Sequence, residues 1–566
     1  MRKWWKEAVG YQIYPKSFYD SNGDGIGDLR GIIEKLDYLQ GLGINLLWLC
    51  PIYKSPMDDN GYDVSDYYDI APEFGTMDDF RDLLTEAKKR DIRIIMDLVL
   101  NHTSDEHPWF LESLKNDNPY RDFYIWHPGY AQPGGSKKEP NNWGSFFTPS
   151  CWEFDKASDE YYMHIFSKKM PDLNWRHEPM RKKLYEMARW WLDLGVDGFR
   201  VDAVAHLERQ WDFLDSQKPG YGPYREDWSK FSNLPRVHDY LREMNEEVFS
   251  KYDIVTVGEV GGDAGIESAL RYVGTGSKQL DMVFTFDHCW MNRGWNSHEP
   301  GWDNSADLYW LKQTFKKWQT GLYGKAWNPL YWLNHDHPRV LSQYGDPTRY
   351  PKESGKMLAT LLLFMWGTPF IYNGEEIGMT NPNYSDLSDY KDQSTLEKAR
   401  RLLEENHPKE LVTRYIQTTS RDNSRTPMQW SDQEDGGFGS MEPWIKMNDN
   451  YEKVNVAAQE RDEDSLLNYY KKLISLRRDS SYKEVIVYGD FTLFDEFHPS
   501  IFAFTRQFMG QTLFVVCNFF AETAYLGLGP LKLKDMIISN YKDDALFEGT
   551  LCLRPYEAAV YVLDRE

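Results

Sequence analysis

Three acidic residues each stand at the end of a short apolar run of the sequence. Asp202 ends GFRVD, Glu259 ends IVTVGE, and Asp336 follows PLYWLNH. Buried acids are unfavourable unless paired, and carboxyl groups close together push at least one pKa upward. Hydrolysis of a glycosidic bond uses such a pair, because one carboxyl protonates the leaving oxygen while the other attacks or activates water. One such acid could equally be structural, but three on different runs favour a catalytic group, as do the basic residues at the same ends: His102, Arg200 and His335.

These residues need elements that bring them together. Short β-rich runs recur along the chain, and amphipathic helical patterns such as residues 177–195 lie between them. The runs are nearly continuous in apolar residues, as in strands that are buried on both faces. Eight strand–helix pairs predict an α/β fold, a (β/α)8 TIM barrel, whose chemistry lies at the carboxyl ends of the strands. The predicted strands are 9–15, 44–50, 93–100, 198–204, 254–260, 282–287, 329–336 and 368–376.

Two insertions interrupt this rhythm. Residues 101–175 follow the third strand, are rich in Trp, Asn, Gly and Pro, and are too long for a simple loop, so they predict a small inserted domain. A second insertion, about residues 377–464, separates the eighth strand from the last helix. The catalytic barrel is thus expected to comprise residues 1–100 and 176–480. Alternating runs after residue 480 predict a C-terminal antiparallel β domain over residues 481–566.

Composition narrows the class of partner. The net charge is −23 and there is no long basic run, which argues against nucleic acid and anionic membranes. Aromatic residues make up 16% of the chain, which fits either a large core or a surface that stacks on sugars. The five cysteines are scattered, which predicts reduced, buried thiols and a cytoplasmic protein. Neither a signal-peptide core nor a stretch of membrane-spanning length is apparent.

The segment DSNGDGIGDLRG, residues 20–31, has oxygen-bearing side chains at its first, third, fifth and ninth positions and Gly25 at its sixth. An EF-hand calcium loop begins in this way but ends on a bidentate Glu at its twelfth position, where this chain has Gly31. The segment by itself is therefore either a metal site or an acidic turn.

Longer motifs resemble one family throughout the barrel. DLVLNH (97–102), GFRVDAV (198–204), VGEV (257–260) and NHD (334–336) occur in the order found in the α-amylase superfamily, glycoside hydrolase family 13. The start AVGYQIYPKSFYDSNGDGIGDLRGI, together with TPFIYNGEEIGM and SRTPMQW, is similar to its α-glucosidase and oligo-1,6-glucosidase branch. The resemblance implies the same architecture as the strand pattern.

The resemblance also implies roles for individual residues. Asp202 would be the nucleophile of a retaining mechanism, Glu259 the general acid and then base, and Asp336 the stabiliser of the distorted sugar. Arg200 would keep Asp202 ionised. The residues expected to surround the ring are Tyr62, His102 and His335.

In the same branch, Asp59 and Arg425 would close the pocket around a terminal glucose, which predicts an exo-acting enzyme. The resemblance also implies one structural Ca²⁺ or Mg²⁺ in the segment 20–31. Because the segment lacks the twelfth-position Glu, this ion would be a structural staple rather than a switch. Its ligands would be Asp20, Asn22, Asp24, the Ile26 carbonyl and Asp28.

Linkage preference in this branch follows the residue after the nucleophile, where valine accompanies α-1,6 cleavage and alanine or threonine accompanies α-1,4 cleavage. Here that residue is Ala203, so the expected activity is release of glucose from maltose and short malto-oligosaccharides. MPDLNW in place of the usual QPDLNW, and His337 in place of a frequent Gln, leave the acceptor side open.

Other functions remain alternatives. The same machinery could serve an α-glucosyltransferase or isomerase, an oligo-1,6-glucosidase, or a hydrolase of sucrose or trehalose. A non-catalytic relative would lose the three acids, which are retained here. An endo-acting amylase is opposed by Asp59 together with Arg425. The expected partner is a small oligosaccharide, and the expected state is a monomer or weak homo-oligomer.

Overall fold

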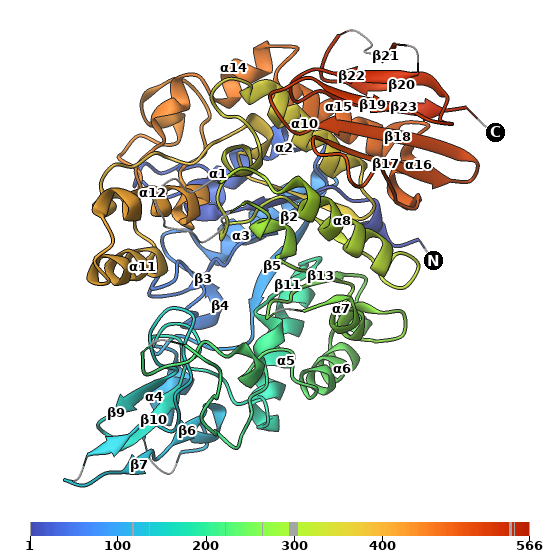
Figure 1. The fold of residues 1–566 in the computed structure, drawn as a ribbon. Helices are drawn as coiled ribbons and strands as arrows, with labels where there is room; N and C mark the ends of the chain where they lie inside the picture. Colours follow the sequence, from blue (N-terminus) through green and yellow to red (C-terminus); the bar gives the residue numbers. More distant parts are fainter. Residues whose placement is uncertain are drawn as a thin grey trace.

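In the computed structural model, eight parallel strands form one sheet that closes into a barrel (Figure 1). Their order is β13-β12-β11-β5-β2-β1-β15-β14, and the first and last strands of this order contact each other. The predicted (β/α)8 barrel is confirmed. The strands are β1 (Gly10–Ile13), β2 (Leu46–Leu49), β5 (Arg93–Val99), β11 (Gly198–Asp202), β12 (Val255–Glu259), β13 (Met282–Phe284), β14 (Pro329–Leu330) and β15 (Thr368–Tyr372).

The structure describes residues 2–115, 118–134, 136–220, 222–262, 264–293, 304–542, 546–547 and 549–564. The predicted outer limits of the domains, residues 1 and 566, lie outside these ranges.

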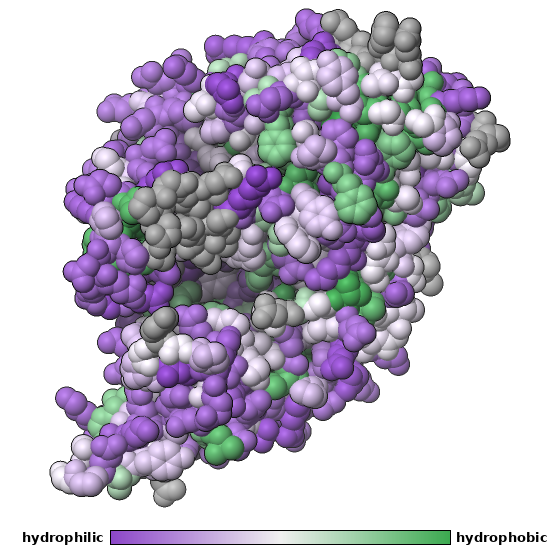
Figure 2. Space-filling model, viewed as in Figure 1, coloured by the Kyte–Doolittle hydropathy of each residue, from purple (hydrophilic) through white to green (hydrophobic). Residues whose placement is uncertain are grey.

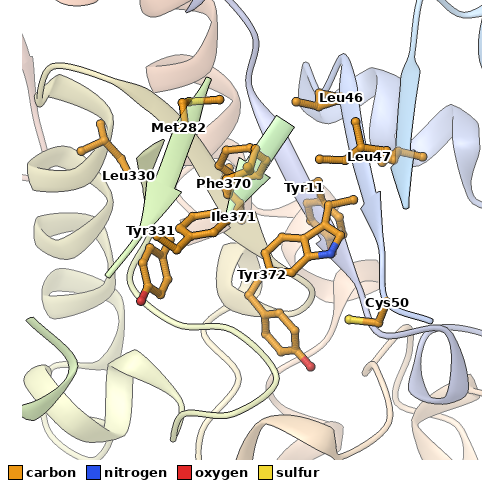
Figure 3. Packing of buried hydrophobic residues seen from close by; sticks show 14 of the residues in the cluster. Tyr11, Leu46, Leu47, Cys50, Met282, Leu330, Tyr331, Phe370, Ile371 and Tyr372 are labelled. Atoms are coloured by element: carbon orange, nitrogen blue, oxygen red, sulfur yellow. The ribbon is translucent and has the colours of Figure 1, made fainter. Parts of the chain in front are cut away.

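The barrel strands are short and almost wholly buried, which explains their continuous apolar runs. Inside the barrel, Phe370 of β15 packs edge-to-face against Trp48 of β2 and Phe284 of β13. Figure 3 shows Phe370 among other buried apolar side chains of the core. The predicted seventh strand, 329–336, is the one that differs most, since β14 ends at Leu330. Trp332 lies beyond the end of the strand but is still buried, and its indole N–H donates to the Leu358 carbonyl of α10 (Pro351–Phe364). The apolar run around Trp332 therefore reflects packing of a loop against a helix and not a strand.

Helices surround the barrel. The barrel helix α10 packs against both α15 and the C-terminal sheet, which accounts for its burial on all sides. The helices are α1 (Leu29–Glu34), α2 (Leu36–Leu42), α3 (Met77–Lys89), α4 (Pro108–Ser113), α5 (Glu178–Leu194), α6 (Val237–Glu247), α7 (Ile266–Val273), α8 (Leu308–Leu322), α9 (Val340–Tyr344), α10 (Pro351–Phe364), α11 (Gln393–Glu404), α12 (Lys409–Thr419), α13 (Asp422–Arg425), α14 (Val456–Arg461), α15 (Leu466–Asp479) and α16 (Lys483–Tyr488).

A lobe after β5 projects from the barrel at the lower left of Figure 1. Its sheet has the order β6-β10-β9, formed by Trp126–His127, Glu160–Met163 and Trp152–Asp155, with a hairpin of β7 (Tyr130–Ala131) and β8 (Lys137–Lys138). Its core also takes in Phe213 and Phe231 from the segment after β11, which the sequence did not indicate. A further hairpin, β3 (Tyr53–Lys54) with β4 (Asp66–Ile70), follows β2. In Figure 2 the surface is hollowed between the lobe and the rest of the molecule.

The C-terminal part contains two antiparallel sheets, at the upper right of Figure 1. One has the order β16-β17-β18-β23-β20 and the other β19-β22-β21. Apolar residues from both sheets share a core of their own. The strands are β16 (Thr492–Phe494), β17 (Ile501–Phe508), β18 (Gln511–Asn518), β19 (Ala524–Gly527), β20 (Leu533–Ser539), β21 (Leu546–Phe547), β22 (Thr550–Leu553) and β23 (Ala558–Leu563).

All five cysteines are free thiols, as predicted, and four are buried. Cys552 is the exception, because alternate residues of β22 face outwards and it is one of them. Within the described parts of the chain, no helix combines the length and apolarity needed to cross a bilayer.

Candidate active site

The three predicted acids line a single cavity of about 340 Å³ at the carboxyl ends of the barrel strands. Asp202 is the last residue of β11, Glu259 is the last residue of β12, and Asp336 lies in the loop after β14. Five of the predicted sugar-contacting residues line the same cavity: Asp59, Tyr62, His102, Ala203 and His335. The two predicted arginines, Arg200 and Arg425, are buried behind this wall, each 1% exposed.

Arg200 connects three carboxyl groups. One guanidinium nitrogen lies 2.5 Å from Asp97 and 2.7 Å from Asp202, and the other lies 2.9 Å from Glu259. Parallel pairing of β5 and β11 places Asp97 beside Arg200, and parallel pairing of β11 and β12 brings Glu259 next to them. Asp97, at the interior of β5, therefore takes part in the network through Arg200.

The charges of this cluster do not balance, because one cation faces three acids. Burial raises the pKa of Asp202 well above its usual value, Arg200 opposes the rise, and the like charges of Glu259 and Asp97 add to it. Burial likewise raises the pKa of Asp97 to about 6. Burial and the neighbouring acids therefore outweigh Arg200, so Asp202 retains a proton more readily than an isolated carboxyl does. A retained proton beside an ionised carboxylate is the state that acid-assisted cleavage needs.

Ala203 has an unusual backbone that orients Glu259. Its φ and ψ are 44° and 31°, in the left-handed region, and its N–H donates to Glu259 at 2.9 Å. Non-glycine residues adopt this conformation rarely and at a cost, and such positions concentrate at functional sites. The second oxygen of Glu259 is thus held by backbone while the first is held by Arg200.

His335 is fixed on three sides. Its ring lies between those of Tyr62, at 5.2 Å, and Tyr14, at 5.9 Å, and both pairs are stacked. The Gln12 amide donates to Nδ1 at 3.0 Å, which leaves Nε2 as the protonated nitrogen, 3.3 Å from Asp336. Burial lowers the pKa of His335 well below its ordinary value, so the ring is a neutral donor.

Asp336 is held ionised. Burial by itself would raise its pKa, but His335, Arg421 and Arg425 outweigh this and hold the pKa well below the usual range. Arg421 lies 2.9 Å and Arg425 3.1 Å from the same carboxylate oxygen. A permanent carboxylate here suits binding of sugar hydroxyl groups.

Arg421, and not the predicted Arg425, lines the cavity beside Asp59. Arg421 lines the cavity and contacts Asp59 at 3.2 Å as well as Asp336. Arg425 lies behind, where it donates to the His335 carbonyl and supports Asp336. Arg421 is the N-cap of α13 and Arg425 is its last residue, so the two arginines are four residues apart in the motif RDNSR. The sequence alone is compatible with either arginine as the one that lines the cavity.

Aromatic side chains form the rest of the cavity wall. Phe146 stacks on Phe166 at 5.1 Å and on Trp228 at 4.3 Å, which makes a column of three nearly parallel rings. Phe147 lies against Arg421, with the guanidinium 5.2 Å from the ring centroid. The high aromatic content was the only signal of this wall in the sequence. Its residues lie in the lobe and in loops, where no periodic pattern identifies them.

Glu375 and Glu376, which follow β15, have structural contacts. Glu375 accepts from Tyr470, and Glu376 accepts from Tyr11 and Tyr38, all in buried surroundings. Burial raises the pKa of Glu375 to about 8. Neither residue lines the catalytic cavity.

The oxygen-rich segment 20–28 folds around Asp20, whose carboxylate accepts from the amides of Gly23 and Gly25. Asp28 accepts from Gly31 and caps α1, and it also accepts from Ser21. Among the described residues, no three His, Cys, Asp or Glu side chains gather as metal ligands would. The side chains of Asn22 and Asp24 and the Ile26 carbonyl add further oxygens, so the donor set suits a hard cation such as Ca²⁺ or Mg²⁺.

Comparison with known proteins agrees with this geometry. Residues 12–489 match the alpha-amylase catalytic domain. The chain is 50% identical to an oligo-1,6-glucosidase of Parageobacillus thermoglucosidasius, with 99% of each chain covered. It is 44% identical to the trehalose-6-phosphate hydrolase of Bacillus subtilis strain 168, covering 99% of this chain and 98% of that one. A crystal structure of isomaltulose synthase from Erwinia rhapontici NX5 superposes with a TM-score of 0.92 at 39% identity, with both chains fully covered.

Sequence, barrel and acids therefore lead to one assignment. The match to the catalytic domain spans most of the chain, and the relatives are similar from end to end. The chain belongs to the alpha-amylase family and is a glycoside hydrolase.

Proposed function

We propose that this chain is an exo-acting, retaining α-glucosidase that releases glucose from the non-reducing ends of short α-glucosides, with a preference for α-1,4 links. The observation that carries the proposal is a cavity with the acid pair and the Asp59–Arg421 ion pair on its wall. We infer that this ion pair closes one end of the cavity. A cavity closed in this way accepts a chain end and excludes the middle of a chain.

In the proposed mechanism, Asp202 attacks the anomeric carbon while Glu259 gives its proton to the glycosidic oxygen. The C–O bond to the leaving sugar breaks as the bond to Asp202 forms. Glu259, now ionised, takes a proton from water, and the resulting hydroxide-like oxygen displaces Asp202 to give glucose with retained configuration. Asp336, Arg421 and neutral His335 bind hydroxyl groups of the distorted ring.

The linkage preference depends on Ala203, whose small side chain lies on the cavity wall beside Glu259. A methyl group leaves space for the leaving sugar of an α-1,4 link. The names of the relatives support oligo-1,6-glucosidase as a second candidate, and the isomaltulose synthase similarity supports transfer to a sugar as a third.

Product analysis distinguishes these candidates. The enzyme is incubated separately with maltose, isomaltose, sucrose, trehalose, trehalose 6-phosphate and maltotriose at low concentration. The proposal expects free glucose, fastest from maltose and maltotriose. Isomaltose as the best substrate would favour the second candidate, and rearranged disaccharides or trisaccharides would favour the third.

Replacing Ala203 by valine is expected to raise the isomaltose-to-maltose ratio of kcat/KM roughly tenfold, because the added methyl groups crowd the α-1,4 leaving sugar. A β-branched residue at positive φ is also strained, which lowers activity on both substrates and cancels in the ratio. Ala203→Gly, which relieves the backbone without adding bulk, is the control. An unchanged ratio in the valine variant would place linkage selection in other walls.

Replacing Asp97 by asparagine is expected to move the alkaline limb of the pH profile of kcat/KM to lower pH by roughly half a unit to one unit. The negative charge of Asp97 raises the pKa of Asp202, so removing that charge favours the ionised form of Asp202 and lowers its pKa. The pKa of Asp97 is raised to about 6, so its charge is mostly absent below that pH and the acidic limb moves less. A shift towards alkaline pH would contradict this electrostatic role.

We also propose that the segment 20–28 binds one structural Ca²⁺ or Mg²⁺. Chelation is then expected to lower Tm by roughly 3–8 °C while activity at moderate temperature changes little, because only the folded state binds the ion. Differential scanning calorimetry with and without chelator measures this. Asp24→Ala protein should not respond to the chelator. Loss of turnover in protein whose Tm is unchanged would mean that the ion takes part in catalysis.

A further inference from the structure

His337 directly follows the ionised Asp336 and lines the same cavity. It is 3% exposed. Its ring packs edge-to-face against Trp290, with the ring centroids 4.9 Å apart, and lies tilted against Phe286 at 5.5 Å. These contacts hold the imidazole in one place on the cavity wall.

Neither ring nitrogen of His337 has a hydrogen-bond partner among the described residues. The other two histidines of the cavity are different: Nδ1 and Nε2 of His102 contact Asn101 and the Tyr62 carbonyl, and His335 is held by Gln12 and Asp336. Buried polar groups in folded proteins are nearly always paired, and an unpaired one is unfavourable. Two unpaired nitrogens on one ring in a cavity therefore indicate a partner that arrives with the ligand.

The His337 ring is neutral near pH 7. Burial lowers the pKa of His337 to about 4, Asp336 opposes this, and Arg421 adds to it. A neutral imidazole offers one N–H donor and one acceptor nitrogen. A sugar hydroxyl group is complementary to either nitrogen, since it both donates and accepts.

We propose that His337 recognises hydroxyl groups of the leaving sugar and so selects saccharide over apolar leaving groups. This inference rests on the proposed function, because it assigns a specificity residue to the same site. In the proposed mechanism, the hydroxyl groups of the glucose ring already have partners in Asp336, Arg421 and His335, which are linked to one another by ion pairs and hydrogen bonds. The nitrogens of His337 are thus left for the part of the substrate beyond the cleaved bond.

An apolar leaving group leaves both nitrogens of His337 buried and unpaired, whereas a sugar pairs them. Sites built to bind a hydroxyl group discriminate strongly against ligands that lack one. A glutamine, which the family often has here, also carries a donor and an acceptor, but on a flexible chain. Glutamine is therefore the conservative substitution and phenylalanine the disruptive one.

The experiment compares kcat/KM on maltose and isomaltose with kcat/KM on 4-nitrophenyl α-glucoside, whose leaving group has no sugar hydroxyl. His337→Phe keeps the packing against Trp290 and is expected to lower the disaccharide-to-aryl ratio about 10- to 100-fold. His337→Gln is expected to keep the ratio within about threefold of the original enzyme. His177→Phe, at the N-cap of α5 and away from the cavity, is the matched control.

Equal loss on all three substrates, or an unchanged ratio in His337→Phe, would overturn the proposal. If the phenylalanine variant does not fold, as judged by circular dichroism, His337→Met takes its place with the same expected ratio. An original enzyme that hydrolyses none of these α-glucosides would instead overturn the proposed function, so the two failures are distinguishable.

Discussion

Replacing Asp202 by alanine is expected to lower kcat by roughly 10⁴- to 10⁶-fold on every α-glucoside, as removal of a catalytic nucleophile does elsewhere. The reason is chemical, because in the proposed mechanism the glucosyl intermediate is bonded to Asp202. The fold is expected to persist, since removal of one acid leaves Arg200 with the two carboxyls of Asp97 and Glu259. Initial rates and thermal melting curves measure the two effects.

Azide tests whether the lost group is a nucleophile. In Asp202→Ala, azide has room to attack the anomeric carbon from the face that the carboxylate used. The new C–N bond forms as the glycosidic C–O bond breaks and Glu259 protonates the leaving oxygen, so the product is the β-glucosyl azide. Asp212→Ala, an exposed acid in the segment after β11, is the control. Activity that survives in Asp202→Ala without azide would reject the assignment of Asp202.

Replacing Arg421 by methionine is expected to lower kcat/KM roughly 10²- to 10³-fold, because truncating one partner of a buried charge pair commonly costs about 2–5 kcal/mol. Arg421 forms ion pairs with Asp59, Asp336 and Asp392, so its loss leaves these buried carboxylates without that shared cation. Burial raises the pKa of Asp59 even with Arg421 present. Without the guanidinium, the closed end of the cavity loses its donor and its positive charge.

Two further variants make the test of Arg421 specific. Arg421→Lys keeps the charge but loses the planar fork, so it is expected to recover only part of the activity. Arg400→Met, on the exposed face of α11, is the control for removing an arginine. If kcat/KM in Arg421→Met stays within about threefold of the original enzyme, the cavity is closed by other groups.

Most of the fold was predictable because the barrel strands are buried on both faces and read as apolar runs. The pattern could not separate a buried strand from a buried loop, and the segment 331–336 shows why. Trp332 is apolar because it packs near α10, and the chain has already left the sheet at Leu330. The participation of Phe213 and Phe231 in the lobe was not predictable either, because it is a long-range contact of an irregular segment.

The positions of the acids were predictable because strand ends in a parallel barrel converge. The choice between Arg421 and Arg425 was not, because it depends on how the short helix α13 is rotated against the cavity. His337 was visible in the sequence as a departure from the family pattern. Its two unpaired nitrogens, however, are a property of packing that only coordinates reveal.

The sharing of Arg200 among Asp97, Asp202 and Glu259 has an evolutionary consequence. Replacement of any one carboxyl changes how the guanidinium is shared between the other two, so the effects of successive replacements in this trio do not add. Epistasis of this kind makes stepwise change within the trio unfavourable. Substitutions that change substrate choice in descendants of this enzyme should therefore accumulate in the aromatic part of the cavity wall and in its loops. In our proposal these residues contact the sugar and do not depend on Arg200.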